Sequence, residues 1–116
     1  MFVEETLNML KESKTIDEND CLEITKILDM LSTKYNINID ENHGSFLLYH
    51  LCAAYGRRKS GEKVEPLEKA MLEDLENLPN YKLSLEVLHD VDVIANNKLG
   101  DNEESYLLLH INNLFV

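Results

Sequence analysis

Four histidines are the residues of this chain best suited to chemistry near neutral pH. They are His43, His50, His89 and His110, and an imidazole can move a proton, bind a metal or take up a phosphoryl group. Seven residues separate His43 from His50, and seven more separate His50 from Arg57. This spacing predicts that the three lie on one stripe of a single helix.

His110 lies in the middle of an apolar run close to the end of the sequence. On a helix it shares a stripe with Glu103 and Leu114, so its ring is expected along or beside a buried seam. Spacing alone favours a structural or surface role for every histidine. Nothing in the surroundings of His43 or His89 points to another role.

Metal binding and nucleophilic catalysis are poorly supported. His50 and Arg57 would stand about 10 Å apart along a helix axis, whereas metal ligands on one helix usually need a spacing of three or four. A metal held between helices by His50 and His110 stays open, but no cysteine or carboxylate pattern accompanies the pair. Cys52 would point about 200° away from His50 on a helix, and no glycine-rich turn offers an oxyanion hole. We therefore expect no metal, no cofactor and no enzymatic activity.

Composition narrows the choice of partners. The formal net charge is −11, with 22 acidic residues against 11 Lys and Arg, so direct binding of nucleic acid is not expected. The one conspicuous basic patch, where an anion would be received best, contains Arg57, Arg58, Lys59 and Lys63.

The location of the protein is predicted from what the sequence lacks. No stretch approaches the roughly 20 consecutive apolar residues that cross a bilayer, and the first residues are acidic where a signal peptide would be positive. We expect a cytoplasmic protein that does not insert into membranes. Cys21 and Cys52 fall within helical patterns and are expected to be reduced, buried side chains.

The elements that must position these residues are all predicted to be helices, because apolar residues recur at helical spacing almost throughout. The prediction is all-α: a compact bundle of five to six helices in a chain of 116 residues. Residues 1–18 are expected to form an N-terminal helical extension, and residues 19–116 a single domain. The predicted helices span about residues 3–14, 21–35, 41–59, 65–77, 82–97 and 103–114.

Capping and turn residues set the predicted helix boundaries. Pro66 is expected in the first turn of the fourth of these helices, and Gly100 in the turn before the last. The predicted N-caps of the second, third and last helices are Asn19 or Asp20, then Asp40, then Asp101 or Asn102.

Two segments of the sequence resemble the motifs of the PTS regulation domain (PRD), a phosphorylatable helical module of bacterial regulators controlled by the sugar phosphotransferase system. The first motif is a helical histidine, an arginine seven residues later and a basic turn with glycine, here His50, Arg57 and RKSG. The second is an acid, an aromatic residue and a histidine followed by isoleucine, here Glu103, Tyr106 and His110. The resemblance covers roughly residues 20–116, as in a small stand-alone member of the family.

The resemblance implies a function and partners. His50 and His110 would accept a phosphoryl group from the phosphocarrier protein or from a sugar permease component of the phosphotransferase system. Family members dimerise through the faces that hold these histidines, so a homodimer is implied. The residues implied as phosphate contacts or supports are Arg57, Arg58, Glu103 and Tyr106. Tyr49 precedes His50 where the family often has an acid, and Ser105 precedes the aromatic residue of the second motif where it usually has glycine.

Two functions follow from these observations. The first is a regulatory phosphoacceptor of the sugar phosphotransferase system, whose phosphorylation on histidine controls dimerisation or partner binding. The alternative is a helical adaptor or subunit that retains the fold as a protein interaction module and is not phosphorylated.

Overall fold

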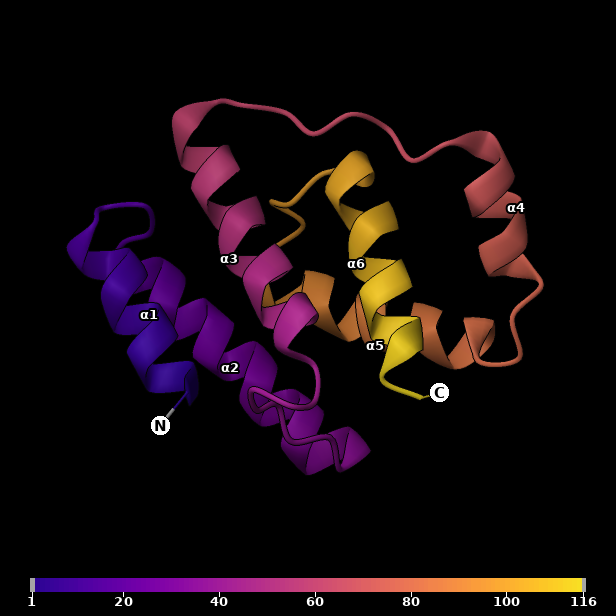
Figure 1. Ribbon diagram of the computed structural model, residues 1–116, viewed down its shortest axis with the longest axis horizontal. Helices are drawn as coiled ribbons and strands as arrows, with labels where there is room; N and C mark the ends of the chain where they lie inside the picture. Colours follow the sequence, from indigo (N-terminus) through magenta and orange to yellow (C-terminus); the bar gives the residue numbers. More distant parts are fainter. Residues whose placement is uncertain (1, 116) are drawn as a thin grey trace.

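The computed structural model describes residues 2–115, and within that range all regular elements are helices (Figure 1). The two outermost positions of the predicted domains, residues 1 and 116, lie outside the described residues. The helices are α1 (Phe2–Glu12), α2 (Glu18–Tyr35), α3 (Ser45–Ser60), α4 (Lys69–Glu76), α5 (Tyr81–Ile94) and α6 (Asp101–Asn113). The all-α prediction is confirmed. None of these described helices is long and apolar enough to cross a membrane.

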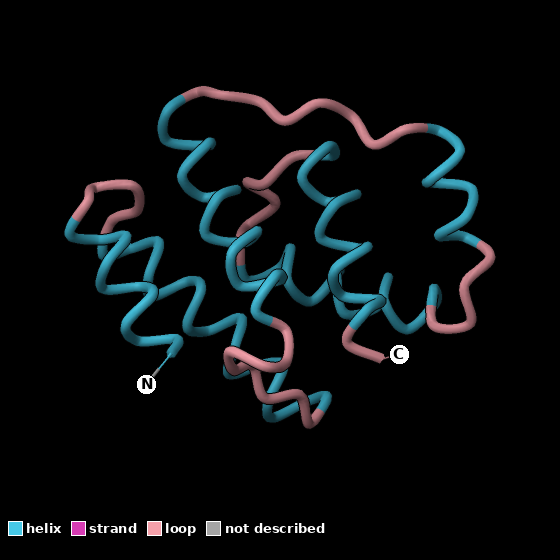
Figure 2. Tube along the Cα trace, in the orientation of Figure 1, coloured by secondary structure: helices cyan, strands magenta, loops and turns pink. Residues whose placement is uncertain are grey.

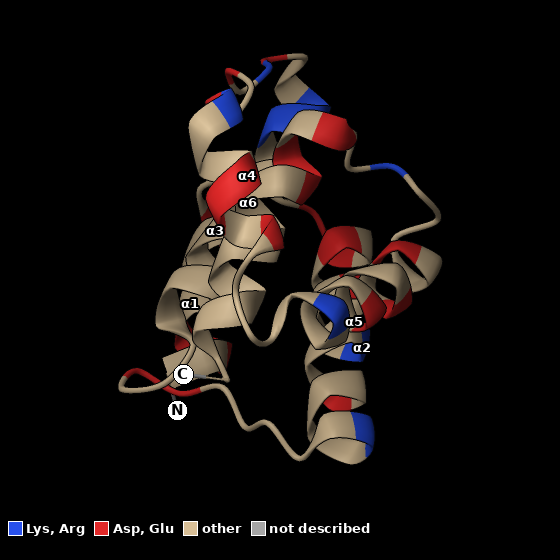
Figure 3. Cartoon of the chain, turned by 90° about the vertical axis from the view of Figure 1, so that its right-hand side faces the viewer, with Lys and Arg blue, Asp and Glu red and all other residues tan. Residues whose placement is uncertain are grey.

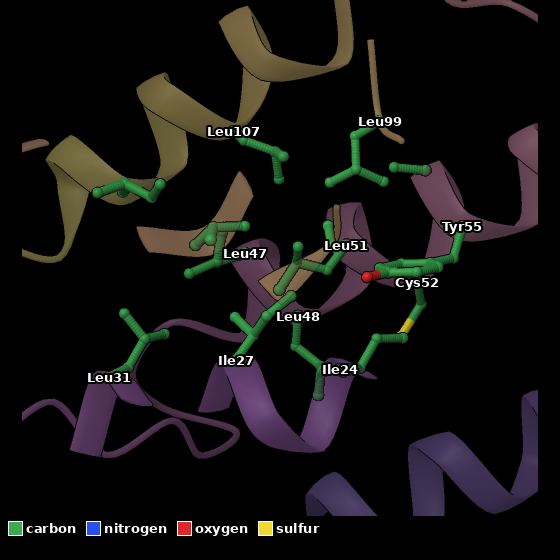
Figure 4. Packing of buried hydrophobic residues seen from close by; sticks show 14 of the residues in the cluster. Ile24, Ile27, Leu31, Leu47, Leu48, Leu51, Cys52, Tyr55, Leu99 and Leu107 are labelled. Carbon is green, nitrogen blue, oxygen red and sulfur yellow. The ribbon is translucent and has the colours of Figure 1, made fainter. Parts of the chain in front are cut away.

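The core lies where α2, α3, α5 and α6 meet (Figure 4). The periodic apolar positions predicted for α2 and α5, such as Ile24, Ile27 and Val87, are fully buried there. α3 supplies Leu47, Leu48 and Leu51 from two sides of its surface, so it is packed on more than one face. Each such aliphatic side chain contributes roughly 1.5–3 kcal/mol through burial.

The helices α3 and α6 run side by side in opposite directions, with α5 crossing behind α6 (Figures 1 and 2). α1 packs against both α2 and α3 and places Leu7 in the shared core. α4 stands on the far side of α6, at the end of an extended linker that follows α3. The antiparallel pair α3 and α6 therefore brings the two predicted motifs together.

The predicted start of α3 is wrong by four residues. Asp40 does not cap the helix; its carboxylate accepts from the backbone amides of Asn42 and His43 in a tight turn. Gly44 then adopts a left-handed conformation with φ of 79°. This backbone favours glycine, and a Cβ at Gly44 would also lie 2.3 Å from Cδ1 of Ile39. α3 therefore begins at Ser45.

Other boundaries also differ from the prediction. α2 is capped by Asp17, whose side chain accepts from the backbone of Asp20 while the Asp20 side chain accepts from the backbone of Asp17. Pro66 lies in the linker, because α4 begins only at Lys69. α6 begins at Asp101 with Gly100 at the N-cap and no side-chain cap.

Candidate functional site

Two histidine rings meet between α3 and α6. His50 comes from the middle of α3 and His110 from the last turns of α6, and their ring centroids are 5.2 Å apart with planes tilted by 44°. Tyr106, one helical turn before His110, stacks on His50 at 5.5 Å between centroids. The structure thus places three residues predicted for the site in one ring cluster, which we call the histidine cluster.

A two-pronged ion pair borders the histidine cluster. Arg57 donates from Nε to Oε2 of Glu103 at 2.6 Å and from Nη2 to Oε1 at 2.8 Å. The Glu103 carboxylate is nearly buried, with 9% of its side chain exposed. This geometry is the strong, charge-assisted kind, and Glu103 raises the pKa of Arg57 further above its usual value. Arg57 therefore neutralises Glu103 at the edge of the site.

The same carboxylate faces His50. The Nε2 atom of His50 lies 3.3 Å from Oε1 of Glu103, but it is buried and lacks the alignment of a hydrogen bond to any residue in the range 2–115. The contact is therefore electrostatic. It would become an ion pair only if His50 gained a proton.

Both rings of the histidine cluster favour the neutral form. Burial lowers the pKa of His50, and the charge of Arg57 lowers it too, although Glu103 acts in the opposite direction. Burial also lowers the pKa of His110, to which repulsion from His50 adds. Each imidazole therefore keeps a lone pair on one ring nitrogen near pH 7, as a nucleophile requires.

The two histidines differ in how a second protein could reach them. Nε2 of His50 is shielded from solvent. The nitrogens of His110 make no hydrogen bond within the described chain and are not among its buried unpaired atoms. His110 also lines a cavity of about 150 Å³ together with His43, Asn113 and the first residues of α3. Both rings are half-buried, and the difference between them is that His50 has one nitrogen, Nε2, closed to solvent.

His43 is exposed, in line with the structural or surface role that spacing favours. The sequence does not predict that it also lines the cavity of His110. The seven-residue spacing of His43 and His50 predicts one continuous helix. The turn at Asp40 instead places His43 before Ser45, the first residue of α3, so the two histidines do not share a helix.

The basic patch predicted around the end of α3 divides in two. Arg57 borders the histidines, whereas Arg58 contacts Asp20 at 3.3 Å and lies over the Tyr55 ring. Lys59 pairs with Asp17. Lysine and arginine gather toward the end of the molecule where α3 stops, at the top of Figure 3. The structure therefore does not bring Arg58 to the histidine cluster.

Two exposed aromatic side chains of α3 lie four positions and one position before His50. Phe46 is 73% exposed and Tyr49 is 48% exposed. Tyr49 makes an edge contact with Phe2 of α1 at 5.8 Å between ring centroids. We call Phe2, Phe46 and Tyr49 the aromatic face, and exposed apolar surface is typical of a contact with another protein.

In the part of the chain that the structure describes, no three His, Cys, Asp or Glu residues are placed to hold a metal ion. Cys21 and Cys52 are both buried and unpaired, as expected, and burial raises the pKa of the Cys52 thiol to about 12.

The fold and the paired histidines define a class of helical regulatory modules. The family model of the PRD domain matches residues 25–114, so this chain belongs to the PRD family. It is also similar to the protein named "Uncharacterized protein YhfY" of Escherichia coli (strain K12), with 28% identity over 98% of this chain and 95% of that protein. No solved structure matches it significantly.

Proposed function

We propose that this chain is a phosphoacceptor module of the sugar phosphotransferase system and that His110 is its first acceptor. The observation that carries the proposal is the pair of neutral histidines 5.2 Å apart between α3 and α6, of which His110 alone has no buried, unpaired nitrogen. Family membership supplies the regulatory context.

The transfer step requires a donor that is itself a phosphohistidine. A lone pair on a ring nitrogen of His110 attacks the donor phosphorus, a new N–P bond forms, and the donor's N–P bond breaks. The donor ring keeps the electron pair of the broken bond, and the second nitrogen of His110 keeps its proton. The lowered pKa of His110 favours this step, because a protonated ring has no free lone pair.

Phosphorylation would change the balance of charge in the histidine cluster. The phosphoryl group adds up to about two negative charges beside His50, whose ring centroid is 5.2 Å from that of His110. A negative neighbour favours protonation of His50. The protonated ring could then bond to the phosphate on one side and to Glu103 on the other.

The aromatic face would link the charge added at His110 to the binding of another protein. Phe46 is exposed and lies one helical turn before His50 on α3, and charge introduced beside an apolar contact changes its affinity. We propose that a second copy of the chain binds the aromatic face and that phosphorylation of His110 alters this homodimer. The phosphocarrier protein or a sugar permease component would deliver the phosphoryl group in the cytoplasm.

The proposal is tested by phosphotransfer. The purified protein is incubated with phosphoenolpyruvate and the general phosphotransferase components, and intact mass is followed. We expect the mass of one phosphoryl group, labile in acid, to appear in the native protein and in the His89→Ala control, since His89 is exposed on α5. His110→Ala should abolish it. Full labelling of His110→Ala, or none of the native protein, contradicts the proposal.

The non-phosphorylated adaptor is a second candidate, and one observation favours it. Arg57, one of the two arginines expected to contact the phosphate, already uses Nε and Nη2 for hydrogen bonds to Glu103. Nε2 of His50 is closed to solvent. An adaptor would use the aromatic face alone. It predicts that the double variant His50→Ala/His110→Ala still dimerises, as measured by analytical ultracentrifugation, and that Phe46→Ser does not.

A further inference from the structure

A small cavity lies between the start of α3 and the end of α6, beside the histidine cluster. Because the two helices are antiparallel, these two ends are neighbours (Figure 1). The volume of the cavity is about 150 Å³. One water molecule takes up about 30 Å³ of the liquid, so the cavity has room for the one phosphorus and three oxygen atoms of a phosphoryl group. We call it the α3–α6 cavity, and its polar lining consists of Asn42, His43, Ser45, His110 and Asn113.

The hydrogen-bond donors around the α3–α6 cavity are not used elsewhere in the described chain. α3 has no side-chain cap, and the backbone amides of Ser45, Phe46 and Leu47 have no acceptor within residues 2–115. The side chains of His43 and Asn113 make no hydrogen bond in that range either. An anion in the cavity would therefore bind without breaking any hydrogen bond of the described chain.

The electrostatics of the α3–α6 cavity also favour an anion. The chain carries a net charge of −11, yet the described residues that line the cavity include no aspartate or glutamate. The first turn of α3, a helix of 16 residues, adds the positive end of its dipole. A phosphoryl group would thus meet donors and a favourable dipole rather than repulsion.

Gly44 lets the two helix ends approach each other. A Cβ at this position would lie 3.1 Å from Cδ2 of Leu114, the residue that follows α6. Without a side chain at Gly44, the first turn of α3 can lie close to the last turn of α6. The ring of His110 therefore lines the same cavity as the start of α3.

We propose that the α3–α6 cavity holds the phosphoryl group of phosphorylated His110. The first amides of α3 donate to its oxygens, as helix N-termini do at other phosphate sites. Asn113 and His43 add side-chain donors and are positioning residues. This inference rests on the proposed acceptor role of His110. It adds that the phosphate is bound through the start of α3, while Arg57 keeps its hydrogen bonds to Glu103.

The position of Phe46 gives this arrangement a regulatory consequence. Phe46 belongs to the first turn of α3, and its side chain is 73% exposed as part of the aromatic face. A phosphate bonded to this turn would bring the added charge next to the surface proposed to bind a second copy of the chain.

The test uses potassium phosphoramidate, a small donor that needs no protein of the phosphotransferase system. A ring nitrogen attacks its phosphorus, the new N–P bond forms, and the old N–P bond breaks as ammonia leaves with the electron pair. The phosphate on each histidine is followed by mass spectrometry of peptides after the donor is removed. We expect the phosphate on His110 to last about 3-fold longer or more than that on His89, which is exposed on α5.

Two variants test the side-chain donors, and both change exposed residues that the fold does not need. His43→Ala and Asn113→Ala should each shorten the half-life of the phosphate on His110 about 3-fold or more, because one charge-assisted hydrogen bond is lost. The phosphate on His89 in the same molecules should be unaffected. Asn113→Gln, which keeps an amide donor, should restore most of the half-life, and Asn8→Ala on the exposed side of α1 should change it less than about 1.5-fold.

Amide NMR shifts test the backbone donors. In His43→Gln, where His110 is the only histidine that lines the α3–α6 cavity, phosphorylation should move the amide protons of residues 45–47 downfield. Adding His110→Ala should abolish these shifts. A structural role of the cavity alone would not produce them.

Three results would overturn the inference: no label on His110, equal lifetimes of the phosphate on His110 and His89, or amide protons of residues 45–47 that do not move. Failure of the proposed function gives a different result. In that case phosphoramidate labels His110 with all the expected effects, but the phosphotransferase components transfer nothing to it.

Discussion

Arg57 and Glu103 join α3 to α6 through two parallel hydrogen bonds of 2.6 and 2.8 Å. The two residues are the flanking members of the two family motifs, and they meet on the side of His50. This ion pair fixes the register of the two helices that carry the histidines. It also keeps the neutralised Glu103 carboxylate next to the His50 ring. Its removal should therefore affect stability and histidine chemistry together.

We predict that Glu103→Gln lowers the free energy of unfolding by about 1–3 kcal/mol, because Arg57 is left partly buried without its charged partner. It should also lower the pKa of His50 further, since the carboxylate is what favours protonation of that ring. Urea denaturation measures the first effect and NMR titration of the ring protons the second. Unchanged stability together with an unchanged pKa would show that the pair is not formed in solution.

Stability should fall in mild acid because of the two histidines. Both have a pKa below the ordinary 6.5 in the folded protein, so the unfolded chain binds protons first. Their contribution to the free energy of unfolding is therefore lost as pH falls from about 6.5 toward the pKa values of the two histidines in the folded protein. Thermal melts of the native protein and of His50→Gln/His110→Gln should show a smaller loss between pH 7 and pH 5 in the double variant, and equal losses would refute the assignment.

Glu104 should destabilise the protein as pH rises. Burial, together with the neighbouring Asp92, raises its pKa from 4.5 to about 7, so the folded state holds a proton that the unfolded chain has released. The stabilisation is complete below about 4.5 and is lost as pH rises through 7. Glu104→Gln should gain up to about 1 kcal/mol at pH 8 and nothing at pH 4.5. A gain of the same size at both pH values would point to packing instead.

The buried hydroxyl of Tyr55 should contribute to stability through Glu23, to which it donates at 2.9 Å. Tyr55→Phe keeps the ring but removes this bond, and we expect a loss of about 1–2 kcal/mol. Tyr49→Phe is the matched control, because Tyr49 is 48% exposed, and it should change stability by less than about 0.5 kcal/mol. Denaturant curves of the two variants decide the question, and similar losses would count against the Glu23 bond.

The sequence was sufficient for the helices but not for every boundary. Periodic apolar residues such as Ile24 and Val87 point inward as predicted, since burial dominates the choice of face. The start of α3 failed because Asp40 bonds to the amides of a turn rather than to a helix. Both arrangements use the same side chain, and the left-handed φ of 79° at Gly44, which follows the turn, leaves no periodic pattern in the sequence.

The site was predictable only in part for a similar reason. Spacing within one helix cannot show that His50 and His110, sixty positions apart, approach each other; the two family motifs supplied that pairing. Spacing puts Arg57 on the stripe of His50, whereas Arg58 points about 100° away from it, but spacing does not identify the partner of either arginine. Their long-range partners separate them: Glu103 of α6 for Arg57 and Asp20 of α2 for Arg58.

The stacking of Tyr106 on His50 gives this protein an optical reporter of its own. The sequence contains five tyrosines and no tryptophan, so tyrosine dominates its near-ultraviolet emission. A proton gained by His50 would replace a stack of two neutral rings with a cation beside an aromatic ring. We therefore expect protonation of His50 to change the share of the tyrosine fluorescence that comes from Tyr106, without any added label.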